Sequence, residues 1–287
     1  MNYSPDIPGD DVATSLDRSL GPAQGRLLLL LAEHLGSVFT IEQARRVLSG
    51  EGPHLRRRLN ELVAKGWVFS LGRGAYMIAP LEAGPDSREY AINRYLAASA
   101  IAGDREHYLS YRSAMELQGM TVHPWRTVYV STASRLRRRE IQGFTVKPVT
   151  VPPARLWGAT TVEAVPDHRV KVSSQSRTIV DCLDRPPYAG GVKDVALGLA
   201  LLGGDFVAEH AVDAALRFGK ISVIKRLGVL VESVVPDQGA VVARLLSYVN
   251  DTPHVLDPGL PREGRLNSRW GIWMNIPEDE LRQDAAS

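Results

Sequence analysis

The chain has 287 residues, of which 44% are hydrophobic and 23% are charged, which is enough apolar material for two domains with separate cores. This composition excludes a wholly disordered chain. The formal net charge is only +2, so a surface that binds nucleic acid would have to be local. Cys182 is the only cysteine, which excludes a disulfide framework and a cysteine-rich zinc site and indicates a reducing, cytoplasmic compartment.

The first twenty residues are acidic and contain few large apolar side chains. We expect residues 1–20 to form a flexible leader and not a secretory signal, which would combine basic residues with an apolar core. The apolar run Leu27–Leu31 is bounded by Arg26 and Glu33, and it is far shorter than the roughly 20 residues that cross a bilayer. The sequence therefore predicts no membrane partner and a buried first helix from Pro22 to Leu35.

Two more helices are predicted after a short extended segment. Thr40 and Gln43 have the spacing of a capping box, which opens the second helix. The third helix is expected from Pro53 to Lys65, and Gly66 ends it. Each helix has an apolar stripe at helical spacing, formed by Ile41, Ala44, Val47 and Leu48 in the second and by Leu55, Leu59, Leu62 and Val63 in the third.

Two short apolar segments, Trp67–Leu71 and Ala75–Ile78, flank a glycine-rich turn that carries Arg73, and they predict a β-hairpin. Three helices and a hairpin are the parts of a winged helix-turn-helix, so we assign residues 21–81 to a DNA-binding domain of this kind. Eight basic and four acidic residues lie between Pro22 and Pro80, which agrees with this assignment. A winged helix that docks on protein has the same parts and stays open as an alternative.

The third helix has a polar face opposite its apolar stripe. Arg57 and Asn60 lie on this face and His54 at its edge, and we expect these three side chains to read base edges. The other candidate residues are expected to contact the DNA backbone, or the minor groove in the case of the hairpin arginine: Arg45, Arg46, Arg56, Arg58 and Arg73. A solvated basic helix is the alternative interpretation of three adjacent arginines.

Residues 82–106 are predicted to form a linker and a connecting helix, and residues 107–287 a C-terminal α+β domain. A helix capped by Ser110 and ending at Gln118 opens this domain. A period of two then predicts a small mixed sheet with strands at 127–130, 143–146, 149–151 and 169–172. A helical period predicts a cluster of helices at 177–183, 192–202, 205–217, 221–234 and 239–249.

A second basic region lies in the predicted sheet, where residues 126–177 contain ten basic and three acidic residues. Arg135, Arg137, Arg138 and Arg139 form its densest cluster, on a loop or short helix between two strands. This cluster is either solvated surface or a second basic surface, which would contact a nucleic-acid backbone or an acidic partner.

The sequence contains no recognised catalytic motif. It lacks a glycine-rich phosphate loop, a pair of histidines with zinc-site spacing and a glycine-flanked nucleophilic serine. We therefore expect no catalytic residues, no metal and no cofactor. Asp181 and Asp184, beside Arg177 and Arg185, are interpreted as partners in structural ion pairs. The alternative function is a DNA-targeted enzyme, either a nuclease or a modifying enzyme, with catalysis in the C-terminal domain.

Several stretches resemble one family, the AbiEi antitoxins of type IV toxin–antitoxin systems. The stretches TIEQARRVL and LRRRLNELVAKGWVFSLGRGAYMI resemble the N-terminal winged helix of that family. The segment YLSYRSAMELQGM resembles the start of its C-terminal domain, and VKVSSQSRTIVDCLDRP and GRLNSRWGIWMNI resemble segments that recur in that domain. The resemblance extends from about Pro22 to Ile276 and leaves out the acidic leader.

The resemblance implies a transcriptional repressor of its own bacterial operon, which binds operator DNA with inverted repeats through the N-terminal domain. It also implies that the C-terminal domain counters a nucleotidyltransferase-like toxin encoded beside it, without a stable complex being required. The protein would be a monomer or a weak dimer that pairs on the operator. The family has no catalytic residues to carry over, and it assigns no residues to toxin neutralisation.

Overall fold

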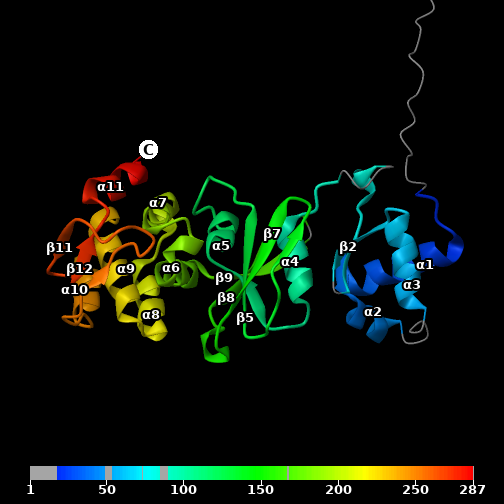
Figure 1. The fold of residues 1–287 in the computed structure, drawn as a ribbon, viewed down its shortest axis with the longest axis horizontal. Coiled ribbons are helices and arrows are strands. Elements are labelled where there is room, and N and C mark those ends of the chain that lie inside the picture. Colours follow the sequence, from blue (N-terminus) through cyan, green and yellow to red (C-terminus); the bar gives the residue numbers. More distant parts are fainter. Residues whose placement is uncertain (1–17, 49–53, 73, 85–89, 167, 287) are drawn as a thin grey trace, which may run out of the picture. The chain divides into compact units, whose positions relative to one another are not determined.

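The computed structural model describes residues 18–48, 54–72, 74–84, 90–166 and 168–286. The chain divides into two compact units, Met1–Ile92 and Asn93–Ser287. Both units combine helices with β-sheet (Figure 1), which confirms the predicted α+β class.

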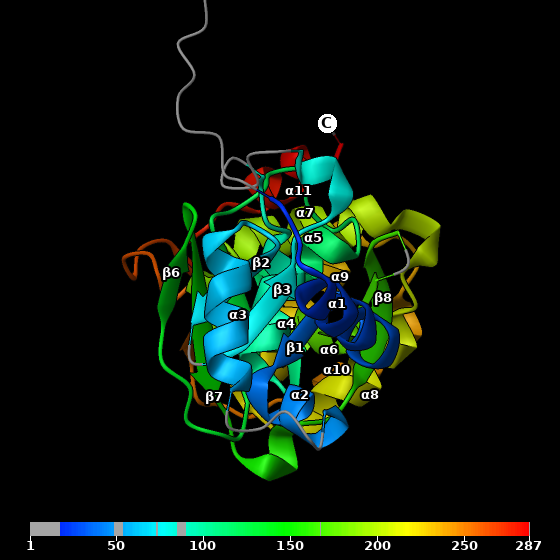
Figure 2. The ribbon, with the colours of Figure 1, turned by 90° about the vertical axis from the view of Figure 1, so that its right-hand side faces the viewer.

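The first unit contains three helices and a three-stranded antiparallel sheet. Its elements, in chain order, are α1 (Pro22–Leu35), β1 (Val38–Thr40), α2 (Ile41–Val47), α3 (Leu55–Ala64), β2 (Val68–Gly72) and β3 (Ala75–Ile78). The sheet has the order β1-β3-β2, so the short strand between the first two helices pairs with the second strand of the hairpin. Figure 2 views this unit with α1 and α3 toward the reader.

Local sequence signals determine where these elements begin. The capping box is present: the backbone N–H of Thr40 donates to Gln43 Oε1 at 2.7 Å, and the backbone N–H of Gln43 donates to Thr40 Oγ1 at 3.1 Å. Gly74 accepts the backbone N–H of Ile41 on its carbonyl oxygen at 2.7 Å and has a φ of +78°. A Cβ at this position would lie 2.8 Å from Ile41 Cγ2, so only glycine fits between the hairpin and α2.

The second unit is built on a six-stranded mixed sheet with the order β6-β7-β5-β4-β9-β8. Its strands are β4 (His107–Leu109), β5 (Thr127–Thr132), β6 (Arg139–Ile141), β7 (Phe144–Thr150), β8 (Ala159–Val165) and β9 (His168–Ser173). The β5–β7 and β4–β9 pairs are parallel and the others are antiparallel. Helix α4 (Arg94–Ala102) covers one face of the sheet, and α5 (Arg112–Leu117) and α6 (Gln175–Asp184) cover the other (Figure 1).

The sheet is larger than the small sheet expected from the sequence. The two strands predicted at 143–146 and 149–151 are one continuous strand, β7, with Pro148 inside it. This position tolerates proline because the edge strand β6 pairs only with residues 144–146 and leaves Pro148 unpaired on that side. Strands β4, β6 and β8 were not predicted, because β4 and β6 are only three residues long and β8 is an exposed edge strand with no apolar alternation.

Five helices gather after the sheet, as the helical period predicted. They are α6, α7 (Val192–Leu202), α8 (Ala208–Phe218), α9 (Ile221–Val234) and α10 (Gly239–Leu246). Helix α9 lies at the centre of this group, since Ser222–Val231 is buried without interruption. Lys225 and Arg226 of α9 are buried too, and they donate to backbone carbonyl oxygens, among them those of Asn250 and Leu256.

The chain ends in a region for which no strand or helix was predicted. A small sheet has the order β10-β12-β11 and contains β10 (His254–Val255), β11 (Arg265–Asn267) and β12 (Ile272–Met274). Helix α11 (Glu278–Ala286) follows and packs on α7 and α9. These strands have two or three residues each, too few for a period of two to be visible in the sequence.

Three of the stretches that resemble the antitoxin family contribute buried residues to the second unit. Gln118 Nε2 donates to the carbonyl oxygen of Ser173 at 2.8 Å and to Thr178 Oγ1 at 3.0 Å. These bonds join the YLSYRSAMELQGM segment to the VKVSSQSRTIVDCLDRP segment. In the GRLNSRWGIWMNI segment, Trp270 is fully buried and its Nε1–H donates to Glu232 Oε2 of α9 at 2.6 Å. These stretches therefore include residues that hold the fold together.

The Trp270 ring lies directly against Gly228 of α9, where an added Cβ would overlap the six-membered ring. We expect Gly228→Ala to destabilise the second unit by about 1–3 kcal/mol, the usual cost of overpacking a core. Gly239→Ala is the matched control, because nothing lies within 4 Å of a Cβ at that helix position. Thermal unfolding of both variants measures the effect, and equal midpoints would contradict this packing.

Candidate nucleic-acid interface

Helix α3 buries its three leucines on one side and exposes polar side chains on the other. Leu55, Leu59 and Leu62 have no exposed surface, and they pack in one cluster with α1, α2 and the sheet. Arg56, Arg57 and Asn60 are exposed on the outer side of the helix. His54 is the N-cap residue and is exposed as well. The structure therefore places four of the predicted contact residues on or beside one accessible face of the helix.

The side chain of Arg57 is 75% exposed. Its Nε lies 3.6 Å from Glu61 Oε1, one helical turn away. An exposed pair of this kind contributes at most about 1 kcal/mol, so the guanidinium can leave Glu61 for another acceptor at small cost. Glu61 also accepts from Gln24 Nε2 of α1 at 3.5 Å.

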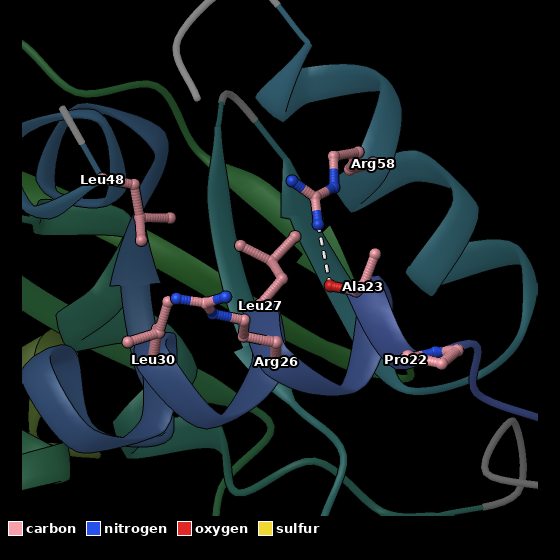
Figure 3. Close-up of a pocket in the computed structure, with 7 residues that line it drawn as sticks. All are labelled: Pro22, Ala23, Arg26, Leu27, Leu30, Leu48 and Arg58. Carbon is pink, nitrogen blue, oxygen red and sulfur yellow. Dashed lines mark hydrogen bonds between the residues drawn. The ribbon is translucent and has the colours of Figure 1, made fainter. Parts of the chain in front are cut away.

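Arg58 lies differently from its two neighbours. Its side chain is half-buried, and Nη2 donates to the carbonyl oxygen of Ala23 at 2.8 Å, which ties α3 to the first turn of α1 (Figure 3). It lines a hollow of about 580 Å³ together with Arg26 and apolar residues of α1 and α2. The helical period put Arg58 on the flank of α3 but could not show that α1 passes along that flank.

Arg26 extends the basic surface onto α1. It is exposed and lines the same hollow as Arg58 (Figure 3). No DNA contact was predicted for Arg26, because this residue lies within an apolar helix far from the arginines of α3 along the chain. Arg26 lies one turn after Ala23, the residue that Arg58 contacts, so the two arginines line one hollow only in the folded unit.

The remaining predicted contacts of this domain lie on α2 and on the hairpin. Arg45 and Arg46 are both exposed in the last turn of α2. Cations in this position also interact favourably with the carbonyl end of the helix. Arg73 lies outside the described residues, between strand β2 and Gly74.

The end of the predicted leader is attached to the first unit. Residues 1–17 lie outside the described residues, whereas Arg18 stacks on the Trp67 ring with its guanidinium carbon 4.2 Å from the ring centre. Trp67 Nε1–H donates to the carbonyl oxygen of Arg18 at 2.7 Å, and Lys65 Nζ donates to that of Ser19 at 3.2 Å. The chain is therefore fixed to the end of α3 from Arg18 onward.

The second basic cluster lies in the larger unit, around the start of the edge strand β6. Arg135, Arg137 and Arg138 are exposed in the irregular segment before that strand, as predicted for a loop. Arg139 is the first residue of β6 and is half-buried. Arg138 Nη2 donates to Glu140 Oε1 at 3.1 Å, so part of the local positive charge is offset.

Asp181 and Asp184 form ion pairs with nearby basic side chains. Arg177 Nη2 lies 2.7 Å from Asp181 Oδ1, with both side chains almost fully buried, and Lys220 Nζ lies 2.6 Å from Asp184 Oδ1. Burial lowers the pKa of Arg177, but the Asp181 carboxylate outweighs it and raises that pKa above its ordinary value. Burial also raises the pKa of the Cys182 thiol well above its ordinary value, which makes this residue unreactive.

No group of three or more histidine, cysteine, aspartate or glutamate side chains among the described residues is placed to hold a metal ion. In the same part of the chain, every helix is too short or too polar to cross a lipid bilayer.

Comparison with known proteins gives a fold and no function. No protein-family model and no curated protein matches the chain. Among solved structures, the crystal structure of the RV2827C protein from Mycobacterium tuberculosis is similar, with a TM-score of 0.64 and 18% sequence identity. The match covers 91% of this chain and 94% of that chain. The two chains therefore share a fold over nearly their full lengths, although few of their residues are identical.

The contact between Arg58 and Ala23 predicts a structural role for one of the three arginines. We expect Arg58→Ala to weaken the attachment of α1 by about 1 kcal/mol, since the carbonyl oxygen of Ala23 loses a charged donor. Amide hydrogen exchange in α1 would then become about fivefold faster. Arg56→Ala serves as the control, because Arg56 is exposed on the same helix. Identical exchange rates in the two variants would show that the contact contributes nothing.

Proposed function

We propose that this protein is an antitoxin of the AbiEi type that represses its own operon. Its N-terminal unit would bind operator DNA as a winged helix-turn-helix, and its C-terminal unit would counter a nucleotidyltransferase-like toxin. The observation that carries the DNA-binding half is the outward face of α3, where Arg56, Arg57 and Asn60 are exposed opposite three buried leucines. The antitoxin half rests on the resemblance of the stretches in the second unit.

The order of elements in the first unit supports the winged-helix interpretation. Helices α2 and α3 follow each other closely, and α3 leads directly into the β2–β3 hairpin. In a helix-turn-helix, the second helix of the pair enters the major groove and the first crosses the backbone. By this correspondence α3 is the recognition helix, α2 lies across the DNA backbone, and β2 and β3 form the wing.

The side chains of α3 then have different roles. Arg57 and Asn60 carry the donors and acceptors that match the edges of guanine and adenine, and His54 lies beside them at the start of the helix. Arg56, Arg45 and Arg46 are exposed cations that would contact phosphates. Arg58 would add to the phosphate contacts from the rim of its hollow, while its hydrogen bond to Ala23 holds the helix in place.

Charge favours DNA over a protein partner for this unit. The centre of a protein–protein interface is usually rich in apolar and aromatic side chains, although arginine is also frequent there. The outward side of α3 carries three polar or basic residues in its first six positions, Arg56, Arg57 and Asn60, and none of its leucines. Such a face fits a polyanion, because binding releases counterions from the phosphates.

Arg57 and Arg56 should differ in what their loss does to DNA binding. We expect Arg57→Ala to lose roughly 1–3 kcal/mol and to relax the preference at one base pair. Arg56→Ala should weaken binding to all sequences alike and reduce the slope of affinity against salt. Fluorescence anisotropy with the operator and a set of single-base variants measures both effects. If the two variants lose affinity in the same way on every duplex, the assignment of roles is wrong.

The antitoxin half has its own test in cells. A nucleotidyltransferase gene next to this one should encode a protein that stops growth when expressed alone, and co-expression of this chain should restore growth. A chain shortened to residues 93–287 should still protect, since this unit would hold the antitoxin activity and has its own core. If the shortened chain fails to protect while the full chain protects, the antitoxin activity does not lie in the second unit alone. Arg57→Ala in the full chain is the control and should protect fully.

A further inference from the structure

A cavity in the second unit is lined by none of the residues proposed to contact DNA. Its volume is about 290 Å³, and it lies between the start of α5, the segment after β7, helix α6, and the α8–α9 junction. Four of its lining residues are cationic: Arg155, Arg177, Arg185 and Lys220. Two carboxylates, Asp181 and Asp184, also line it, so the cavity has an excess of two positive charges. An anion is the ligand that this imbalance favours.

The four cations are not equally engaged by the two carboxylates. Asp184 is shared, with Lys220 Nζ at 2.6 Å and Arg185 Nε at 3.8 Å. Asp181 is held by Arg177. Arg155 forms no ion pair with any described residue, and its guanidinium instead stacks on the Phe218 ring at 3.8 Å from the ring centre. Arg155 is therefore a positioned cation whose hydrogen-bond donors are not used by a carboxylate.

Arg177 provides the second, independent observation. Its side chain is only 1% exposed, and Nη2 donates to Asp181 Oδ1 at 2.7 Å. The Nε and Nη1 donors of the same guanidinium are buried and have no acceptor among the described residues. Buried donors without acceptors each cost about 1–3 kcal/mol, so a ligand that supplies acceptor oxygens beside this group would gain that energy.

The aromatic rings fix these guanidinium groups in place. Arg177 lies 4.3 Å from the centre of the Trp157 ring and 5.2 Å from that of Phe218. The Phe218 ring is in turn covered by Arg155. Stacked guanidinium groups present their N–H donors edge-on, which suits an oxyanion with several acceptors in one plane. The site is thus already arranged, and little side-chain entropy would be lost when it binds a ligand.

We propose that this cavity binds a small phosphate-bearing molecule, no larger than a nucleoside monophosphate. Phosphate oxygens match the fork of an arginine in two parallel hydrogen bonds. The volume lies at the lower end of the range for small-molecule sites, which excludes a large cofactor. Val151, Pro152 and Phe218 give part of the lining an apolar surface, against which a nucleoside could pack.

The test is calorimetric titration of the full chain with inorganic pyrophosphate and, separately, with adenosine and guanosine monophosphate. One ligand should bind per chain, and Arg155→Ala should reduce its affinity at least tenfold. Arg217→Ala is the control of matched charge, because Arg217 also stacks on Trp157, at 4.3 Å, but does not line the cavity. This control should bind as the unaltered chain does. Binding of pyrophosphate alone would identify the phosphate as sufficient, and binding of the nucleotides alone would show that the nucleoside is required.

Three results would overturn the proposal. The first is that neither pyrophosphate nor either nucleotide binds at millimolar concentration. The second is that Arg155→Ala and Arg217→Ala lose the same affinity, which would make the effect one of general charge. The third is that none of the small ligands binds, while duplex DNA binds less tightly to Arg155→Ala than to the unaltered chain. This result would contradict a small-molecule site. Thermal unfolding without ligand shows whether each variant is folded. If Arg155→Ala is not folded, Arg185→Ala replaces it, because Arg185 is a more exposed side chain.

Discussion

The burial of three leucines determines what helix α3 presents to its surroundings. Leu55, Leu59 and Leu62 have no exposed surface in the core of the first unit. Exposing any one of them would cost about 1.5–3 kcal/mol, so the helix cannot rotate about its axis. Its opposite side must then carry Arg57 and Asn60 outward. The proposed recognition of DNA depends on this constraint, since a helix free to rotate could not place the same two side chains against the same bases.

Arginines have two distinct uses in this protein. Most of the described arginines of the first unit are exposed, and Arg57 has a weak partner, Glu61, which an incoming phosphate or base could replace. In the second unit Arg177 and Arg226 are buried: Arg177 pairs with Asp181 one turn along α6, and Arg226 joins α9 to the segment after β10 through the carbonyl oxygen of Leu256. The overall charge of +2 hides this difference. An arginine available for binding differs from a structural arginine in its burial and its partners. The number of arginines does not show this difference.

Much of the fold could be predicted because local signals were strong. The bounds of α1, α7 and α9 agree with the helical period, and the capping box at Thr40 forms as expected. The short strands β10 to β12 have no local signal, since their pairing is made by residues that are distant in sequence. The same limit applies to the candidate site. The exposure of Arg57 follows from its helix alone, whereas the contact of Arg58 with Ala23 spans 35 residues and needs the folded unit.

The central claim is that the first unit recognises a duplex through α3. The most direct measurement is the affinity of the full chain for the DNA upstream of its own gene, against unrelated DNA of equal length, at several salt concentrations. If α3 recognises the duplex, we expect tighter binding to the upstream DNA and an affinity that falls steeply as salt rises, because phosphate contacts release counterions. Equal affinity for both duplexes, or an affinity that does not change with salt, would contradict it.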